Sequence, residues 1–167
     1  MPETMPVDPM EFRRALGCFA TGVTVITAMD TDGKPRGLTA NAFSSLSLDP
    51  TLVLVCVDHR SDTFPVIGQA EFFAINILGE EQREISQRFA RKGEDKFEGV
   101  PFRQGQTGAP IIEGALAVIE CLVHQAYEAG DHTIFIGNVQ HVEHLPSGKP
   151  LLFFRGNYAS LPEATPV

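Results

Sequence analysis

Hydrophobic residues recur along the chain with two spacings, one typical of helices and the other of strands. The first stripe has helical spacing and consists of Met10, Phe12, Ala15, Leu16 and Phe19. Asp8 before it is suited to cap the helix, and Pro9 suits the first helical position. The stripe predicts an amphipathic helix that begins at residue 9 and ends near Thr21-Gly22.

Most of the other apolar runs predict strands. They cover residues 23–30, 36–43, 51–57, 72–78, 115–127, 132–144 and 151–158. The sequences T-D-G-K at 31–34 and E-A-G-D at 128–131 predict two hairpin turns. The run TLVLVCV at 51–57 is so apolar that we expect a central strand buried on both faces.

Two further segments predict helices, and one predicts a loop. Residues 62–69 and 80–91 have helical character, the second with Ile85 and Phe89 on one face. Residues 92–110 are rich in Gly, Gln and Pro and predict a long surface excursion. Many strands, few helices and hairpin connections together predict a mainly β domain, a closed antiparallel barrel with helices packed at its ends.

Length and charge restrict the classes of function. The chain of 167 residues is expected to form one domain over residues 8–160, with flexible termini at 1–7 and 161–167. The net charge of −8 argues against a nucleic-acid partner and against an anionic membrane. No apolar run approaches the ~20 residues that span a bilayer. Three widely separated cysteines and the lack of a signal-peptide pattern predict a cytoplasmic protein with reduced thiols.

Several well-known chemical motifs are absent from the sequence. It has no P-loop, no G-x-G-x-x-G dinucleotide fingerprint, no G-x-S-x-G elbow and no H-E-x-x-H pair. His141 and His144 lie three apart on a predicted strand, where their side chains point to opposite faces. We therefore expect exposed histidines there and no shared metal.

Small polar side chains gather around the apolar run at 51–57. Before it come Thr39, Asn41, Ser44, Ser45 and Ser47; after it come Asp58, Arg60, Ser61 and Thr63, which precede a predicted helix. Hydroxyl groups and free backbone N–H groups suit a ligand that is flat at its centre and polar at its rim, such as a flavin with its phosphate. Such residues also commonly do no more than cap helices and close turns, so the residues alone leave both readings open.

Seven segments, in this order, resemble the short-chain flavin reductases, the reductase components of two-component flavin monooxygenases. They are FRRALGCFATGVTVIT, GLTANAFSSLSLDPTLVLVCV, the pair Ser61-x-Thr63, FFAINIL, RFARKGEDKFEG, GAPIIEGALAVIECLVHQAYEAGDHTIFIGNV and PLLFFRGNY. The resemblance covers roughly residues 11–160. It implies a split β-barrel with a few flanking helices that binds FMN or FAD, forms a homodimer and delivers reduced flavin to a monooxygenase.

The resemblance also implies roles for individual residues. Thr39, Ala40, Asn41, Ser44 and Ser45 would line the isoalloxazine ring and ribityl chain, and Cys56, Val57 and Asp58 would flank the ring. Ser61, Thr63, Lys96 and Phe97 would meet the phosphate region, while Asp131, His132 and Tyr158 would approach the nicotinamide. Five of these residues have a simpler alternative: Cys56, Phe97 and Tyr158 as packing, Asp131 as a turn cap and Lys96 as a surface lysine.

The implied reaction transfers hydride from C4 of NADH or NADPH to flavin N5, chemistry that the cofactors carry themselves. His132 is the residue expected to contact the nicotinamide. The choice between FAD and FMN stays open, and so does the nucleotide, since Arg36, Arg60 or Arg155 could each meet a 2′-phosphate. Three alternatives remain: an oxidase of the same barrel with tightly bound FMN, a non-catalytic flavin- or heme-binding module, and a barrel that binds another protein.

Overall fold

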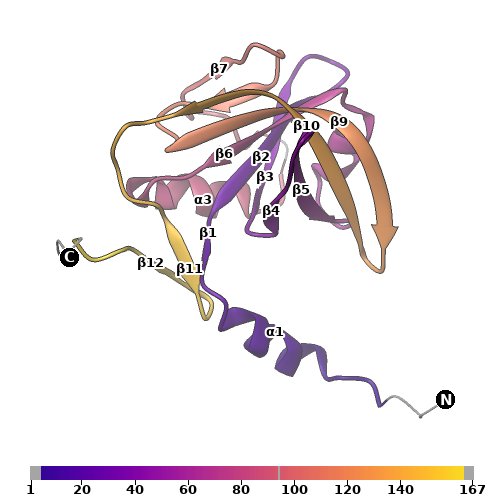
Figure 1. Ribbon diagram of the computed structural model, residues 1–167, viewed down its shortest axis with the longest axis vertical. Coiled ribbons are helices and arrows are strands. Elements are labelled where there is room, and N and C mark those ends of the chain that lie inside the picture. Colours follow the sequence, from indigo (N-terminus) through magenta and orange to yellow (C-terminus); the bar gives the residue numbers. More distant parts are fainter. Residues whose placement is uncertain (1–4, 94, 164–167) are drawn as a thin grey trace.

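The fold is built around one seven-stranded antiparallel sheet with strand order β3-β2-β6-β9-β10-β5-β4 (Figure 1). The computed structural model describes residues 5–93 and 95–163. The strands of this sheet are β2 (Thr24–Met29), β3 (Pro35–Ala40), β4 (Phe43–Leu48), β5 (Thr51–Asp58), β6 (Phe72–Ile77), β9 (Ala117–Ala129) and β10 (His132–His144). The expected mainly β, antiparallel class is confirmed.

Smaller elements surround the main sheet. Two strands, β7 (Phe102–Gln104) and β8 (Pro110–Ile112), pair with each other; β1 (Thr21–Gly22), β11 (Leu152–Phe154) and β12 (Asn157–Ala159) form a second small sheet. The helical segments are α1 (Pro9–Gly17), α2 (Phe64–Gln69), the 3-10 turn η1 (Glu80–Gln82) and α3 (Arg83–Phe89). Within the described part of the chain, no helix has the length and hydropathy needed to cross a bilayer.

The sheet curls so that its two ends approach each other. β3 is an edge strand, and it contacts β5 near the opposite edge. Beyond the end of β5, the Thr63 hydroxyl donates a hydrogen bond of 2.8 Å to the Gly37 carbonyl on β3. This closure brings the segment after β5 close to β3, so that Ser61 and Thr63 lie near Thr39.

β5 is buried on one face, and the expectation of burial on both faces was wrong. Val53, Val55 and Val57 are buried, while Leu52 and Leu54 are only half-buried. β5 pairs with β10 and with the edge strand β4, so it lies next to the rim of the sheet. An uninterrupted apolar run does not by itself distinguish burial on both faces from burial on one.

α1 begins as predicted, with the Asp8 carboxylate accepting a bond of 2.9 Å from the Met10 amide and Pro9 in the first turn. Its apolar stripe, however, covers no part of the core. Phe12 and Leu16 are each 55% exposed, and no residue of α1 is buried. Figure 1 shows the helix extending away from the sheet near the N-terminal end.

The structure also has β4 at 43–48, where no strand was predicted, and α1 ends at Gly17 instead of near Thr21-Gly22. Two further segments differ from their predicted structure. Residues 151–158, expected as one strand, form the hairpin β11–β12, with left-handed Arg155 (φ 48°) and Gly156 (φ 76°) at its turn. Residues 92–110, expected on the surface, contain β7 and bury Phe97 and Val100 in a core cluster. Of the expected flexible termini, residues 1–4 and 164–167 lie outside the described residues.

Candidate functional site

A cavity of about 300 Å³ lies between β3, the end of β5 and the C-terminal end of α3. It is lined by Leu38, Thr39, Asp58, Arg60, Ser61, Asp62, Phe89, Ala90, Arg91, Lys92 and Lys96. Four of the predicted site residues are among them: Thr39, Asp58, Ser61 and Lys96. Four basic side chains and two carboxylates border this cavity, so it has an excess of positive charge in a chain of net charge −8 and suits an anionic group such as a phosphate.

Lys96 is buried and held in place by backbone carbonyls. It is 9% exposed, and its Nζ donates to the carbonyl oxygens of Gly37 at 3.1 Å and Phe89 at 3.4 Å. Burial lowers the pKa of Lys96, while the nearby charge of Asp62 raises it. An ammonium group has three donors, so these two bonds leave a third for a ligand in the cavity.

The segment between β5 and α2 supplies the opposite wall. Ser61 Oγ accepts a bond of 3.2 Å from the Thr63 amide, and Asp62 Oδ2 accepts one of 2.8 Å from the Gly93 amide. The second bond ties this segment to the loop that follows α3. Thr63 itself is buried, and its hydroxyl donates to the Gly37 carbonyl. It therefore stabilises the wall without lining the cavity.

Asp58 and Arg60 form an ion pair at the mouth of the cavity. Arg60 Nη2 lies 2.8 Å from Asp58 Oδ2, and the Arg60 amide donates to Asp58 Oδ1 at 2.8 Å. The hydrogen bond from the Arg60 side chain, followed by the one from its amide, holds the pKa of Asp58 well below its usual range. Part of the positive charge of Arg60 is therefore already neutralised.

Asp131 and His132 lie beside this ion pair, at the tip of the β9–β10 hairpin. His132 is the cross-strand partner of Asp58, and its Nδ1 lies 2.6 Å from Asp131 Oδ1. This hydrogen bond lowers the pKa of Asp131, and it outweighs desolvation, which acts in the opposite direction. Asp131 thus orients the imidazole, which is partly exposed and leaves Nε2 for a second ligand next to the cavity.

The other predicted site residues lie outside the cavity lining. Asn41, Ser44 and Ser45 are exposed near and on β4, and Cys56 is half-buried on β5, where burial raises the pKa of its thiol. Ala40 and Val57 pack in or against the main core cluster.

Phe97 and Tyr158 make mainly packing contacts. The Phe97 ring packs edge-on against Phe89 and Phe102, with centroids 4.9 and 5.0 Å away. Tyr158 packs against α3, where its hydroxyl lies 2.7 Å from Ser86 Oγ. Ser86 in turn accepts a hydrogen bond of 2.6 Å at its carbonyl from Thr39, so Tyr158 is linked to the cavity wall through α3.

Sequence reasoning missed Asp62 and the basic pair Arg91-Lys92. The pair lies two residues after Phe89, the last residue of α3, within the run RFARKGEDKF. Two adjacent basic residues at the end of a short helix were the available signal. Their approach to Ser61 depends on the curl of the sheet, which the sequence pattern does not show.

The fold and cavity define a mainly β protein with a basic pocket suited to a phosphorylated cofactor. The family model described as "Flavin reductase like domain" matches residues 16–162. A flavin reductase of Pseudomonas putida is 45% identical over 91% of this chain and 89% of its own length. A reductase subunit of a flavin-dependent monooxygenase of Mycobacterium tuberculosis is 43% identical over 95% of this chain and 86% of its own.

Solved structures agree with this relationship. Nitrilotriacetate monooxygenase component B homologue from Mycobacterium thermoresistibile superposes with a TM-score of 0.89 at 41% identity, covering 95% of this chain and 90% of that one. An NADH:FAD oxidoreductase of Streptomyces globisporus has a TM-score of 0.89 at 38% identity, covering 97% and 99%. This chain belongs to the flavin reductase-like family. It is an NAD(P)H:flavin oxidoreductase, which confirms the reaction expected from the sequence.

Proposed function

We propose that this enzyme uses NADH to reduce FAD and passes the reduced flavin to a flavin-dependent monooxygenase. The Streptomyces NADH:FAD oxidoreductase supports the two cofactors, and the mycobacterial reductase subunit supports the partner. The observation that carries the proposal is the placement of buried, cationic Lys96 and the Asp131–His132 pair at the same end of the sheet. One group suits a flavin phosphate and the other suits the nicotinamide.

In this arrangement the protein binds and orients. A bound flavin supplies the hydride acceptor. Lys96 and Ser61 hold the phosphate nearest the ribityl chain, and Asp131 fixes the imidazole of His132 toward the nicotinamide. Thr39, Ala40, Asn41, Ser44, Ser45, Cys56, Val57 and Asp58 form the ring side of the proposed site. Correct placement of two reactants contributes a large part of the rate enhancement of such a transfer.

The arginines support NADH over NADPH. Arg36 pairs with Asp30 at 2.9 Å and Arg60 pairs with Asp58 at 2.8 Å, so two of the three candidates for a 2′-phosphate already contact carboxylates. We expect kcat/KM to be at least about tenfold higher with NADH, since neither Arg36 nor Arg60 is free to give the 2′-phosphate a charge-assisted hydrogen bond of about 1.5–3 kcal/mol. NADH and NADPH oxidation, each with FAD, FMN and riboflavin, tests this; equal values for both nucleotides would contradict it.

Replacing His132 with alanine should raise the KM for NADH about 3- to 10-fold and leave the Kd for FAD unchanged. The reason is the loss of one hydrogen bond of about 0.5–1.5 kcal/mol on the nicotinamide side only. Steady-state kinetics and a flavin fluorescence titration measure the two constants. His124→Ala, an exposed histidine on β9, is the matched control. Unchanged kinetics in His132→Ala would remove this residue from the site.

We also propose that the enzyme is a homodimer that acts in the cytoplasm. The exposed stripe of α1, with Met10, Phe12 and Leu16, is an apolar surface that a second copy would cover. All three cysteines are free, which supports a reducing compartment.

The double substitution Phe12→Glu and Leu16→Glu should convert a dimer into a monomer, because it places two carboxylates on that surface. Light scattering after size exclusion should give about twice the chain mass of 18.2 kDa for the wild type and the single mass for the variant. Gln69→Glu, on the exposed side of α2, is the control. A monomeric wild type would disprove the dimer.

A further inference from the structure

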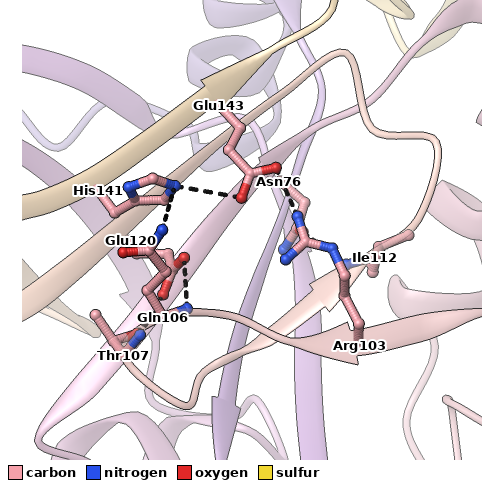
Figure 2. A network of polar contacts seen from close by, with 8 residues as sticks. All are labelled: Asn76, Arg103, Gln106, Thr107, Ile112, Glu120, His141 and Glu143. Atoms are coloured by element: carbon pink, nitrogen blue, oxygen red, sulfur yellow. Dashed lines mark hydrogen bonds and ion pairs between the residues drawn. The ribbon is translucent and has the colours of Figure 1, made fainter.

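A cluster of side chains that can ligate a metal lies on the β9–β10 ribbon, away from the proposed flavin site. Glu120 on β9 and His141 on β10 are direct cross-strand partners, and Glu143 lies two residues beyond His141 on the same face (Figure 2). One possible ligand atom from each lies within 4.8 Å of the others. His132 begins the same strand nine residues earlier, so roughly 30 Å of strand separates this cluster from the nicotinamide side.

Glu120 is a carboxylate buried without a counter-charge. It is fully buried, and within residues 5–93 and 95–163 it forms no ion pair. Its partners are neutral donors: the Gln106 amide on Oε1 at 3.1 Å, and the Thr107 amide and hydroxyl on Oε2 at 2.8 and 2.6 Å. Burying a charge is costly unless it is paired or coordinates a metal.

The β7–β8 loop is built directly over this carboxylate. A Cβ at Gly105 would lie 2.5 Å from the Glu120 carboxyl carbon, so only glycine allows the approach. The loop thereby fixes the position of Glu120 and places the Gln106 side chain 3.4 Å from His141 Nε2. A rotation of that amide would present its carbonyl oxygen to the same point.

Glu143 and His141 already have the spacing of two ligands of one ion. Glu143 Oε1 lies 3.3 Å from His141 Nε2, while Glu143 Oε2 is held by Arg103 at 2.6 Å. Two ligands at about 2.0–2.1 Å from a tetrahedral zinc ion are about 3.3 Å apart. Arg103 anchors Glu143 Oε2, and donors from Gln106 and Thr107 anchor both oxygens of Glu120. This is the outer-shell support that ligating carboxylates receive in metal sites.

We propose that Glu120, His141 and Glu143 bind a divalent first-row cation, with Zn²⁺ as the reference ion. One imidazole and two carboxylates suit zinc and its neighbours, whereas Mg²⁺ and Ca²⁺ prefer oxygen ligands alone. The ion neutralises the buried charge of Glu120 and links β9 to β10 beneath the β7–β8 loop. The partly exposed Glu143 and His141 leave a path for the ion to enter. The proposal is independent of the flavin chemistry.

Calorimetric titration of the full chain with Zn²⁺ tests the proposal. Cys18 is exposed and its thiol would compete for zinc, so the titration uses a Cys18→Ser background. We expect one ion per chain, a higher unfolding temperature in its presence, and at least about tenfold weaker binding in His141→Gln. His144→Gln, an exposed histidine on the same strand outside the cluster, should bind zinc like the parent.

The partly exposed Glu143→Gln provides a second variant, should His141→Gln fail to fold. Co²⁺ gives a second readout, because its visible absorption reports ligand geometry and should be lost in both variants. Failure of the Cys18→Ser chain to bind one zinc ion would overturn the proposal. Binding that is equally strong in folded His141→Gln and Glu143→Gln would also overturn it.

Discussion

Replacing Lys96 with methionine should raise the Kd for FMN about 10- to 100-fold and leave the Kd for riboflavin nearly unchanged. The two ligands differ only by the phosphate, so their comparison isolates the contact that Lys96 is proposed to make. A charge-assisted hydrogen bond is worth about 1.5–3 kcal/mol, which corresponds to this range. Methionine keeps most of the length and the apolar volume of the lysine stem, which limits disturbance of the surrounding core. Fluorescence titration with both flavins measures the effect.

The alternative role of Lys96 is a structural one, since its Nζ also bridges the carbonyls of Gly37 and Phe89. Loss of that bridge alone would weaken FMN and riboflavin binding equally, and this outcome would contradict the phosphate role. Lys34→Met, an exposed lysine in the β2–β3 turn, controls for the loss of one positive charge.

The same contact predicts a pH dependence. Only the protonated amine attracts the phosphate, and burial lowers the pKa of Lys96. The affinity for FMN should therefore fall as the pH rises through this lowered pKa, at a lower pH than a surface lysine would give. Riboflavin affinity should not follow this change. An identical pH profile for the two flavins would contradict the assignment.

Replacing Gly137 with alanine should lower the free energy of unfolding by about 1–3 kcal/mol, the cost of overpacking a filled core. Gly137 lies on β10, and a Cβ there would be 2.7 Å from both Cys121 Cβ and Phe73 Cζ, whose side chains are fully buried. For a chain of this length the change corresponds to a decrease in Tm of roughly 2–12 °C. Thermal unfolding followed by circular dichroism measures it.

The control is Gly68→Ala on α2, where an added Cβ meets nothing within 4 Å and alanine is the better helix former. It should leave Tm unchanged or raise it. Adding Phe73→Leu to Gly137→Ala should cost less than the sum of the two single changes, because the smaller side chain makes room for the methyl group. Strict additivity would place the strain elsewhere.

Local patterns predicted most elements of the fold. The Asp8-Pro9 start of α1, the β2–β3 hairpin and the two long strands of the β9–β10 hairpin all have strong short-range signals and all are present. The β11–β12 hairpin was missed because its turn contains Arg155 in a left-handed conformation, which non-glycine residues rarely adopt. The exposure of α1 was not predictable either, since an apolar stripe is the same whether it meets its own core or another molecule.

Single residues of the candidate site could be predicted from the sequence, but their arrangement in space could not. Ser61 and Lys96 could be proposed from their segments, but their meeting across one cavity with Asp62 and Arg91 depends on the curl of the sheet. The pairing register of β10 with β9 could not be predicted from the sequence either. His141 was expected to be an exposed histidine near a strand end, yet it lies half-buried opposite Glu120, a pairing that depends on the irregularity between Val139 and His141. Sequence spacing carries information along one strand and little about its neighbour.

The pairing of β1 with β11 is expected to form late in folding. Gly22 lies opposite Leu152, so the ribbon joins residues 130 positions apart. During synthesis, β1 therefore has no partner until residue 152 has left the ribosome. Pairings between such distant segments are slow to form, because the entropy of closing the loop is lost before the contacts are gained. Refolding should accordingly be slower than in a helical protein of this size, with the β1–β11 contact among the last to appear.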